Sequence, residues 1–406
     1  MRLSVTALMA RVEGGARSRV QRYLPTCLYN RVRMTTITTV ALLASLPESL
    51  TNFRGPFIEL LRERGHPVVA CAPQAPPGVL RELAKLGVEF TGIGVKRNKI
   101  SLIGDILYTL KVCAWLRRAR PDVLISYTAK PVIFGLLAGR ICGIRARCAL
   151  ITGLGYAFTG RSRRRRLLAW IMTRLYRVAL NGSACVIFQN PDDLEVFKGR
   201  GMLPVGARTV VVNGSGVDLR RFEPRQLPDE PVFLLIARLL KDKGIKEYAE
   251  AARVVKSQYT NARFQLAGWH DTSPVAVSRA DLDHWIVEGL IEYLGPLEDV
   301  RPALAAARIY VLPSYREGTP RTVLEAMAMG RPVITTNAPG CRETVAHEVN
   351  GLLVPAGDVP QLAAAMIRMI RNPSMTEAFG RAGLRMAREK YDARMVSEAM
   401  AAAIGV

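Results

Sequence analysis

The sequence predicts an α/β protein made of two doubly wound parallel-sheet domains that face each other across a cleft. Its 406 residues exceed what one ordinary hydrophobic core accommodates. Short apolar runs rich in β-branched residues alternate with helical stretches along the chain, which is typical of a parallel sheet covered by helices on both faces. Turn residues concentrate between Gly206 and Asp229, where one series ends and a second begins. This pattern is that of two Rossmann-like domains.

The first series of alternations covers residues 34–215. It opens with an apolar run from Ile37 to Ser45, which a loop from Leu46 to Asn52 follows. Strands are expected at 37–45, 67–71, 88–92, 122–126, 148–152 and 184–189, and helices near 53–63, 78–86 and 102–118, from 131 onward and after 160. Residues 1–33 hold seven arginines and one acid, and their apolar patch is too short for a secretion signal. We interpret them as a disordered basic arm or a mis-called start.

The second series covers residues 216–388, and a final helix is expected in residues 389–406. Strands are expected at 231–237, 263–267, 291–294, 309–312, 332–336 and 352–354. Ligands of doubly wound sheets bind outside the carboxyl ends of the strands. Two such domains facing each other therefore predict a site in the cleft between them.

The net charge of +23 is concentrated in the first half of the chain. Residues 1–200 hold 32 Lys and Arg against 11 Asp and Glu, whereas residues 201–406 hold 25 against 23. This asymmetry indicates a polyanionic partner for the first half, either an anionic membrane surface or a nucleic acid. The chain has no apolar run near the length of about eighteen residues that a membrane span needs. Its seven scattered cysteines favour a reducing cytosol over a disulfide framework or a zinc site.

Two glutamates stand eight positions apart across an expected junction between a loop and a helix. The run from Ile309 to Leu312 reads as a buried strand, and Pro320 as the first helical residue. Glu317 then lies in the loop, and Glu325 lies on the helix, roughly 8 Å along its axis. Free N–H groups at the helix start suit a phosphate between the two carboxylates. An isolated pair of this kind is also common in solvated helices, but the neighbouring motifs favour a nucleotide-sugar site.

Two cations follow another strand end. Arg238 and Lys243 stand in the loop after the strand that ends near Ile236. Arg238 offers a planar fork of donors and Lys243 a compact charge, which together suit the negative charge that develops on a leaving nucleotide diphosphate. Alone they would read as surface cations near a helix start. Their position ahead of the two glutamates favours the functional interpretation.

Five motifs resemble the family 4 retaining glycosyltransferases, which have the GT-B fold of two Rossmann-like domains. They are 314–318 (SYREG), 324–327 (LEAM), 339–345 (PGCRETV), 126–131 (SYTAKP) and 151–158 (ITGLGYAF). The last two are similar to the subgroup that acts on polyprenyl-diphosphate-linked sugars or assembles capsule and O-antigen units. The resemblance covers about residues 36–400. It implies that the final helix crosses back to the first domain.

The resemblance also implies roles for the donor-site residues. Glu325 would bind the ribose hydroxyls, Glu317 would lie near the donor sugar, and the backbone at Gly318 and Thr319 would hold phosphate oxygens. Gly340 and Glu343, at a second expected junction between a loop and a helix, would make further donor contacts. The residues alone leave double displacement and front-face attack both open. The resemblance implies the front-face route, in which the departing diphosphate takes the acceptor's proton and no strong protein base is needed. No metal or other cofactor is expected, because Arg238 and Lys243 replace the need for a cation.

Acceptor contacts are expected at two strand ends of the first domain. Tyr127 and Lys130 follow one strand, and Gly153 and Gly155 follow the next. Both loops should face the cleft, and Lys130 is the first choice for an acceptor phosphate or hydroxyl. The 46–52 loop lacks the glycine pair that many relatives have.

A membrane contact is expected on the helix after residue 160. Arg163, Arg166, Trp170, Arg174 and Arg177 form one stripe of that helix, and apolar residues form the opposite face. Trp prefers the membrane interface and Arg pairs with phosphate, so this stripe suits an anionic membrane surface. The alternative is a solvated helix with one exposed Trp.

The sequence thus predicts a metal-independent retaining glycosyltransferase at the cytoplasmic face of the membrane, which moves a hexose or N-acetylhexosamine from a UDP-sugar to a lipid-diphosphate-linked sugar. Asp281 and Asp283 match the metal-binding Asp-x-Asp string, but they fall inside an expected helix. One alternative function is that of a UDP-sugar 2-epimerase on the same scaffold. Another is a polyanion-binding protein; of its expected interleaved aromatic residues, only Trp170 is suitably placed. Nucleic acid is therefore not expected as a partner, and the oligomeric state stays open.

Overall fold

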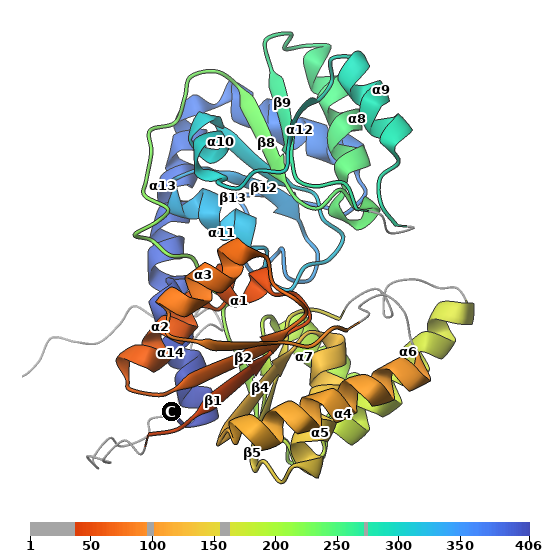
Figure 1. The fold of residues 1–406 in the computed structure, drawn as a ribbon. Coiled ribbons are helices and arrows are strands. Elements are labelled where there is room, and N and C mark those ends of the chain that lie inside the picture. The colour runs from red at the N-terminus through yellow and green to blue at the C-terminus, as the bar shows by residue number, and fades with distance from the viewer. Residues whose placement is uncertain (1–36, 96–100, 155–162, 272–274) are drawn as a thin grey trace, which may run out of the picture. The chain divides into compact units, whose positions relative to one another are not determined.

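The computed structural model describes residues 37–95, 101–154, 163–271 and 275–406. Within them, two separate parallel sheets confirm the predicted fold class (Figure 1). The first sheet has the strand order β3-β2-β1-β4-β5-β6-β7. Its strands are β1 (Val40–Leu43), β2 (Val68–Ala72), β3 (Glu89–Gly92), β4 (Val123–Tyr127), β5 (Ala146–Ile151), β6 (Cys185–Phe188) and β7 (Thr209–Val211). The expected basic arm, residues 1–33, lies outside the described residues.

Helices cover both faces of the first sheet. On one face lie α2 (Gly55–Glu63) and α3 (Pro77–Lys85), whose apolar residues share a core with β1 and β2. The other face is covered by α4 (Leu102–Ala119), a π-helical turn (Pro131–Gly135), α5 (Leu136–Ile141), α6 (Arg163–Leu180) and α7 (Pro191–Gly199). The expected loop at 46–52 instead contains a short helix, α1 (Glu48–Asn52), because Leu50 is buried in the core and ties the segment down.

The second sheet has the order β10-β9-β8-β11-β12-β13. Its strands are β8 (Val232–Ile236), β9 (Arg263–Ala267), β10 (Glu292–Gly295), β11 (Ile309–Leu312), β12 (Val333–Thr336) and β13 (Gly351–Val354). On one face pack α8 (Ile245–Lys256), α9 (Arg279–Val287) and α12 (Val359–Arg371), and on the other α10 (Arg301–Ala306), α11 (Arg321–Ala328) and α13 (Pro373–Lys390). Residues of β8 and β11 are almost all fully buried, as central parallel strands require.

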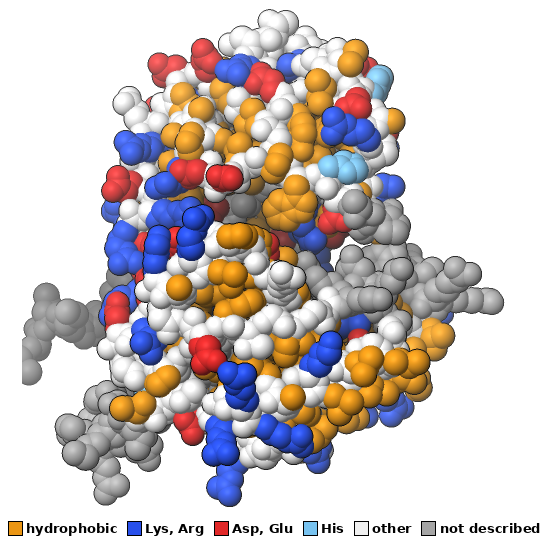
Figure 2. Space-filling view, in the orientation of Figure 1, with side chains coloured by type: hydrophobic (Ala, Val, Ile, Leu, Met, Phe, Trp, Pro, Cys, Tyr) orange, Lys and Arg blue, Asp and Glu red, His pale blue; other side chains and the backbone are white. Residues whose placement is uncertain are grey.

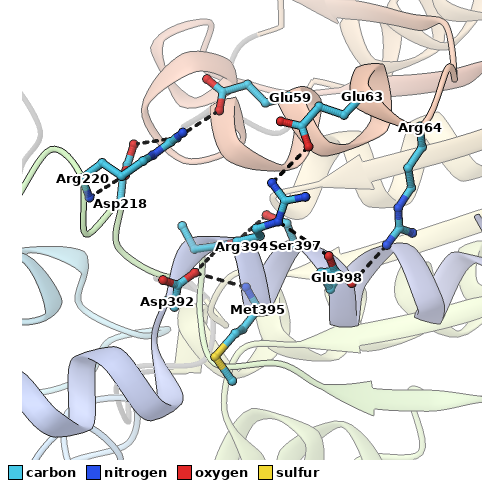
Figure 3. A network of polar contacts seen from close by, with 11 residues as sticks. Glu59, Glu63, Arg64, Asp218, Arg220, Asp392, Arg394, Met395, Ser397 and Glu398 are labelled. Carbon is cyan, nitrogen blue, oxygen red and sulfur yellow. Dashed lines mark hydrogen bonds and ion pairs between the residues drawn. The ribbon is translucent and has the colours of Figure 1, made fainter.

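The last helix, α14 (Ala393–Ile404), packs on the first sheet. Val396, Met400 and Ile404 belong to the same core as β1 and α2. Around this apolar contact, Arg394 pairs with Glu63 at 3.0 Å and Arg64 with Glu398 at 3.1 Å (Figure 3). Exposed pairs of this kind add less than about 1 kcal/mol each. The buried apolar residues therefore provide most of the energy that holds the chain's end on the first domain.

Candidate functional site

The carboxyl ends of β8 and β11 bring the predicted cation and the predicted acid together. Lys243 lies in a single 3-10 turn (Lys241–Lys243) after β8, and Glu317 lies in the loop of residues 313–319 after β11. The Lys243 Nζ atom is 2.6 Å from Glu317 Oε1, although 74 positions separate the two residues. The side chains are 14% and 16% exposed, so water screens the pair only partly. Arg238 is more open, at 41% exposed, and its guanidinium lies 3.5 Å from the carboxylate of Asp271.

Two glycines let the 313–319 loop pack closely on its neighbours. A side chain at Gly318 would collide with the carbonyl oxygen of Thr152, which follows β5 of the first domain. Gly340 has φ of 81°, and a side chain there would collide with the carbonyl oxygen of Glu317. The Glu317 amide also donates to the Pro339 carbonyl at 2.9 Å. The backbone around Glu317 and Gly318 is therefore held between two other loops.

The first domain grips this loop through residues that the sequence analysis did not select. Asn190 Nδ2 donates to the Gly318 carbonyl at 2.7 Å, and Thr319 Oγ1 donates to the Gln189 carbonyl at 2.8 Å. Arg316 pairs with Asp193, whose side chain is fully buried. Burial raises the pKa of Asp193, and the Arg316 contact opposes that shift. Gln189, Asn190 and Asp193 lie where β6 ends and α7 begins. Their position after a predicted strand was the one signal that could have selected them, because in sequence they look like an ordinary start of a helix.

Glu325 is 6% exposed and lies on α11. Arg321 Nε is 2.8 Å from its carboxylate, and the Arg321 guanidinium lies over the ring of Phe53 at 5.3 Å. Burial raises the pKa of Glu325, while Arg321 opposes the shift. The prediction that Pro320 is the first helical residue was wrong by one position, because Pro320 has an extended ψ of 106° and serves as the N-cap.

The expected helix after Gly340 is absent from the described residues. Residues 339–344 form turns instead, in which Cys341 N donates to Ala338 O and Thr344 N to Cys341 O, and the left-handed Gly340 is incompatible with a continuous helix. Glu343 is half-buried here, and its carbonyl accepts from Lys390 Nζ at 3.0 Å. Burial, and then repulsion by Asp192, raise the pKa of the Glu343 carboxyl.

The predicted acceptor residues make internal contacts. Tyr127 is 2% exposed, its hydroxyl lies 3.0 Å from Ser49 Oγ, and burial raises its pKa to about 12. Lys130 Nζ is 2.5 Å from the buried carboxylate of Asp105 on α4. Gly153 lies beside Gly318: a Cβ atom at position 153 would be 3.9 Å from the Gly318 amide nitrogen. Gly155 lies outside the described residues.

A pocket of about 630 Å³ opens at the carboxyl ends of β1, β2 and β3. Its polar lining is Ser45, Glu48 and Gln74, and the rest of its wall is Leu46, Pro47, Pro73, Ala75, Pro76, Pro77 and Val95. The Glu48 Oε2 atom is buried and has no hydrogen-bond partner among the described residues. The sequence analysis missed this pocket because the 46–52 segment carries no recognisable motif.

The predicted arginine stripe on α6 is only partly free. Trp170 is 58% exposed, and the Arg174 guanidinium lies over its ring at 5.4 Å. Arg166 is exposed, but Arg177 Nε donates to the Gly201 carbonyl at 2.6 Å, which ties it to the protein. The side chain of Arg163 lies outside the described residues.

The Asp-x-Asp string lies on α9, as expected. Asp281 N donates to Ser278 Oγ at 3.0 Å in the cap of this helix, and Asp283 pairs with Arg279 at 3.1 Å. Among the described residues, no group of three or more His, Cys, Asp or Glu could hold a metal ion.

The two halves of the chain match two family descriptions. "Glycosyl transferases group 1" matches residues 230–372, and "Glycosyl transferase 4-like domain" matches residues 55–214. The chain belongs to the group 1 glycosyltransferases. The Lys243–Glu317 pair lies within the first of these matches, and most residues that line the pocket beside Glu48 lie within the second.

Curated relatives of this glycosyltransferase include two enzymes of lipid-linked glycans. The N,N'-diacetylbacillosaminyl-diphospho-undecaprenol alpha-1,3-N-acetylgalactosaminyltransferase of Campylobacter jejuni is 27% identical over 83% of this chain and 90% of its own. The UDP-Gal:alpha-D-GlcNAc-diphosphoundecaprenol alpha-1,3-galactosyltransferase of Escherichia coli is 26% identical over 67% of this chain and 72% of its own.

Solved structures share the fold of this glycosyltransferase. Sucrose-phosphate synthase from Thermosynechococcus elongatus has a TM-score of 0.72 at 19% identity, covering 90% of this chain and 98% of its own. Anabaena Alr3699/HepE in complex with UDP has a TM-score of 0.71 at 18% identity, covering 90% and 99%. The chain therefore has the GT-B fold.

Proposed function

We propose that this glycosyltransferase moves a hexose or N-acetylhexosamine, with retention, from a UDP-sugar to a lipid-diphosphate-linked sugar at the inner face of the cell membrane. The observation that carries the proposal is the Lys243–Glu317 contact at the carboxyl ends of β8 and β11. Two relatives named as transferases to diphospho-undecaprenol-linked sugars support the acceptor class. An epimerase is not favoured, because it needs base groups at the site and each of the four histidines contacts a residue outside the Lys243–Glu317 pair. His66 contacts Thr38, His270 contacts Val277, His284 contacts Glu288 and His347 contacts Leu353.

The cations act on the leaving group. A lysine ammonium has three donors, so Lys243 can keep its contact with Glu317 while it donates to a phosphate oxygen. Arg238 stands after the same strand and adds a second positive charge to the diphosphate. Stabilising that charge lowers the barrier to breaking the bond between the sugar and the diphosphate. Glu317 then stabilises positive character on the sugar or binds one of its hydroxyls, and the departing diphosphate takes the acceptor's proton.

The acceptor sugar occupies the pocket at the ends of β1–β3. Its polar side chains can accept hydrogen bonds from sugar hydroxyls and donate hydrogen bonds to them; they belong to Ser45, Glu48 and Gln74. The prolines provide apolar surface for the C–H face of the ring. The buried oxygen of Glu48, to which no described residue hydrogen-bonds, supports this assignment, because a buried polar atom without a partner is costly until a ligand satisfies it.

Glu325→Ala is expected to weaken binding of UDP about tenfold to a hundredfold, the range for losing a hydrogen bond to a charged group. The catalytic rate at saturating donor should change much less, because the ribose lies away from the reacting atoms. Calorimetric titration with UDP measures the affinity, and Glu325→Gln, which keeps the shape of the buried side chain, is the matched variant. Unchanged UDP affinity in both variants would contradict a ribose-binding role.

Sugar transfer is expected to persist in excess EDTA. Arg238 and Lys243 supply the positive charge at the diphosphate that a divalent cation supplies in metal-dependent enzymes. Initial rates of UDP release, measured with EDTA and with added Mg²⁺ or Mn²⁺, should agree within about twofold, a difference of less than 1 kcal/mol in the barrier. Loss of activity in EDTA and its recovery on adding a cation would refute the metal-independent mechanism.

A further inference from the structure

Helix α4 exposes a row of large apolar side chains. Leu102, Ile103, Ile106, Leu107 and Leu110 are 77%, 74%, 52%, 52% and 60% exposed. Their spacing places them on one face of the helix, while Tyr108, Val112 and Leu116 pack on the sheet from the other face. Hydrophobic side chains gather along this helix at the lower right of Figure 2. Single exposed apolar residues are ordinary, but a contiguous row marks an interaction surface.

The surroundings of this row are strongly basic. Residues 101–180 contain fifteen Lys and Arg and two Asp. Of these two, Asp105 is buried against Lys130, and Asp122, beyond the end of α4, accepts a hydrogen bond from the Thr39 amide. Exposed cations continue the outer face of α4 toward its C-terminus and lie on the other helices of the same layer: Lys111, Arg117, Arg118, Arg140, Arg166 and Arg174.

The row lies at the same edge of the sheet as the acceptor pocket. Asp105, in the first turn of α4, reaches Lys130 just beyond the carboxyl end of β4. Val95, just beyond β3, lines the pocket. The carboxyl ends of parallel strands share one edge, so the apolar half of α4 and the pocket both stand there.

We infer that the outer face of α4 docks on the surface of an anionic bilayer, with its apolar row inserted at the level of the acyl chains and the surrounding cations on the lipid phosphates. Apolar side chains flanked by cations suit such a surface, because the apolar groups leave water for the lipid while the cations contact the lipid phosphates. The inference rests on the proposed function, since a lipid-linked acceptor presents its diphosphate at this depth. A second copy of the chain fits less well, because two such basic surfaces repel each other.

The test measures binding of the full chain to phosphatidylcholine vesicles with and without phosphatidylglycerol. The double variant Ile103→Glu/Leu110→Glu should bind the anionic vesicles at least about tenfold more weakly than the unchanged chain, because it removes apolar contacts and adds charges that the lipids repel. Val287→Glu on α9, where an apolar residue is 86% exposed in the second domain, is the control and should bind like the unchanged chain. Both replaced α4 residues are exposed, so melting temperatures should agree.

Three results would overturn the inference. The first is that the double variant binds anionic vesicles as tightly as the unchanged chain does. The second is that Val287→Glu weakens vesicle binding as much as the double variant does. The third is that the unchanged chain sediments as a dimer, and that the double variant is a monomer with unchanged vesicle binding. Transfer to a water-soluble, short-chain acceptor separates this inference from the proposed function. The double variant should keep that activity. If neither the unchanged chain nor the double variant transfers sugar to the short-chain acceptor, while vesicle binding behaves as expected, the proposed function fails and the docking surface stands.

Discussion

Lys243→Ala is expected to lower the rate of sugar transfer about a hundredfold to a thousandfold, the usual effect of removing one preorganised group that stabilises developing charge. Lys243 is held by Glu317 at 2.6 Å in a site that is largely shielded from water, so water screens its attraction to a diphosphate bound there only partly. Initial rates of UDP release at several donor concentrations measure the effect on both kcat and KM.

Lys241→Ala is the matched control, because Lys241 stands in the same 3-10 turn but is exposed. It should leave the rate nearly unchanged. Lys243→Ala combined with Glu317→Ala adds a second check. Residues that act as a unit give non-additive losses, so the double variant should be little slower than the slower single variant. A rate loss shared by Lys241→Ala would mean that the whole turn, and not the Lys243 charge, matters.

The local pattern of the sequence was sufficient for the sheets and for part of the site. Buried strands such as β8 and β11 are nearly continuous apolar runs, and a cation or acid that follows such a run must lie at the carboxyl edge of the sheet. That is why Lys243 and Glu317 could be assigned in advance to one candidate site, although their direct contact was not predicted. Strand β7 was not predicted, because it has only three residues, none of them buried, and it stands among turn residues.

The local pattern could not predict contacts between residues that lie far apart in the sequence. Arg316 and Asp193 lie 123 positions apart, and Asp193 looks in sequence like an ordinary first-turn acid of α7. The pairing of Lys130 with Asp105 likewise depends on how α4 packs beside β4, which no local motif records. In sequence the apolar row on α4 looks like the buried face of a core helix, and only the structure shows that it is exposed.

Arg316→Met is expected to lower the free energy of unfolding by about 3 kcal/mol, because it leaves the fully buried carboxylate of Asp193 without its cation. Since Arg316 belongs to the 313–319 loop that carries Glu317, the rate of transfer should fall as well. Arg342→Met is the matched control. Arg342 faces the neighbouring Asp192 at 3.6 Å, and both side chains are more than a third exposed, so its loss should cost less than about 1 kcal/mol.

The loss caused by Arg316→Met should depend on pH. Burial already raises the pKa of Asp193, and Arg316 opposes that shift, so removing Arg316 raises the pKa further. An acid whose pKa is higher in the folded chain than in the unfolded chain makes stability fall as pH rises between the two values. The loss should therefore be smallest near the unfolded value, about 3.9 for an aspartate, and grow toward neutral pH. Denaturant unfolding at acid and neutral pH measures this difference, and adding Asp193→Asn should abolish it; an equal loss at both pH values would show that burial of the Asp193 charge is not its cause.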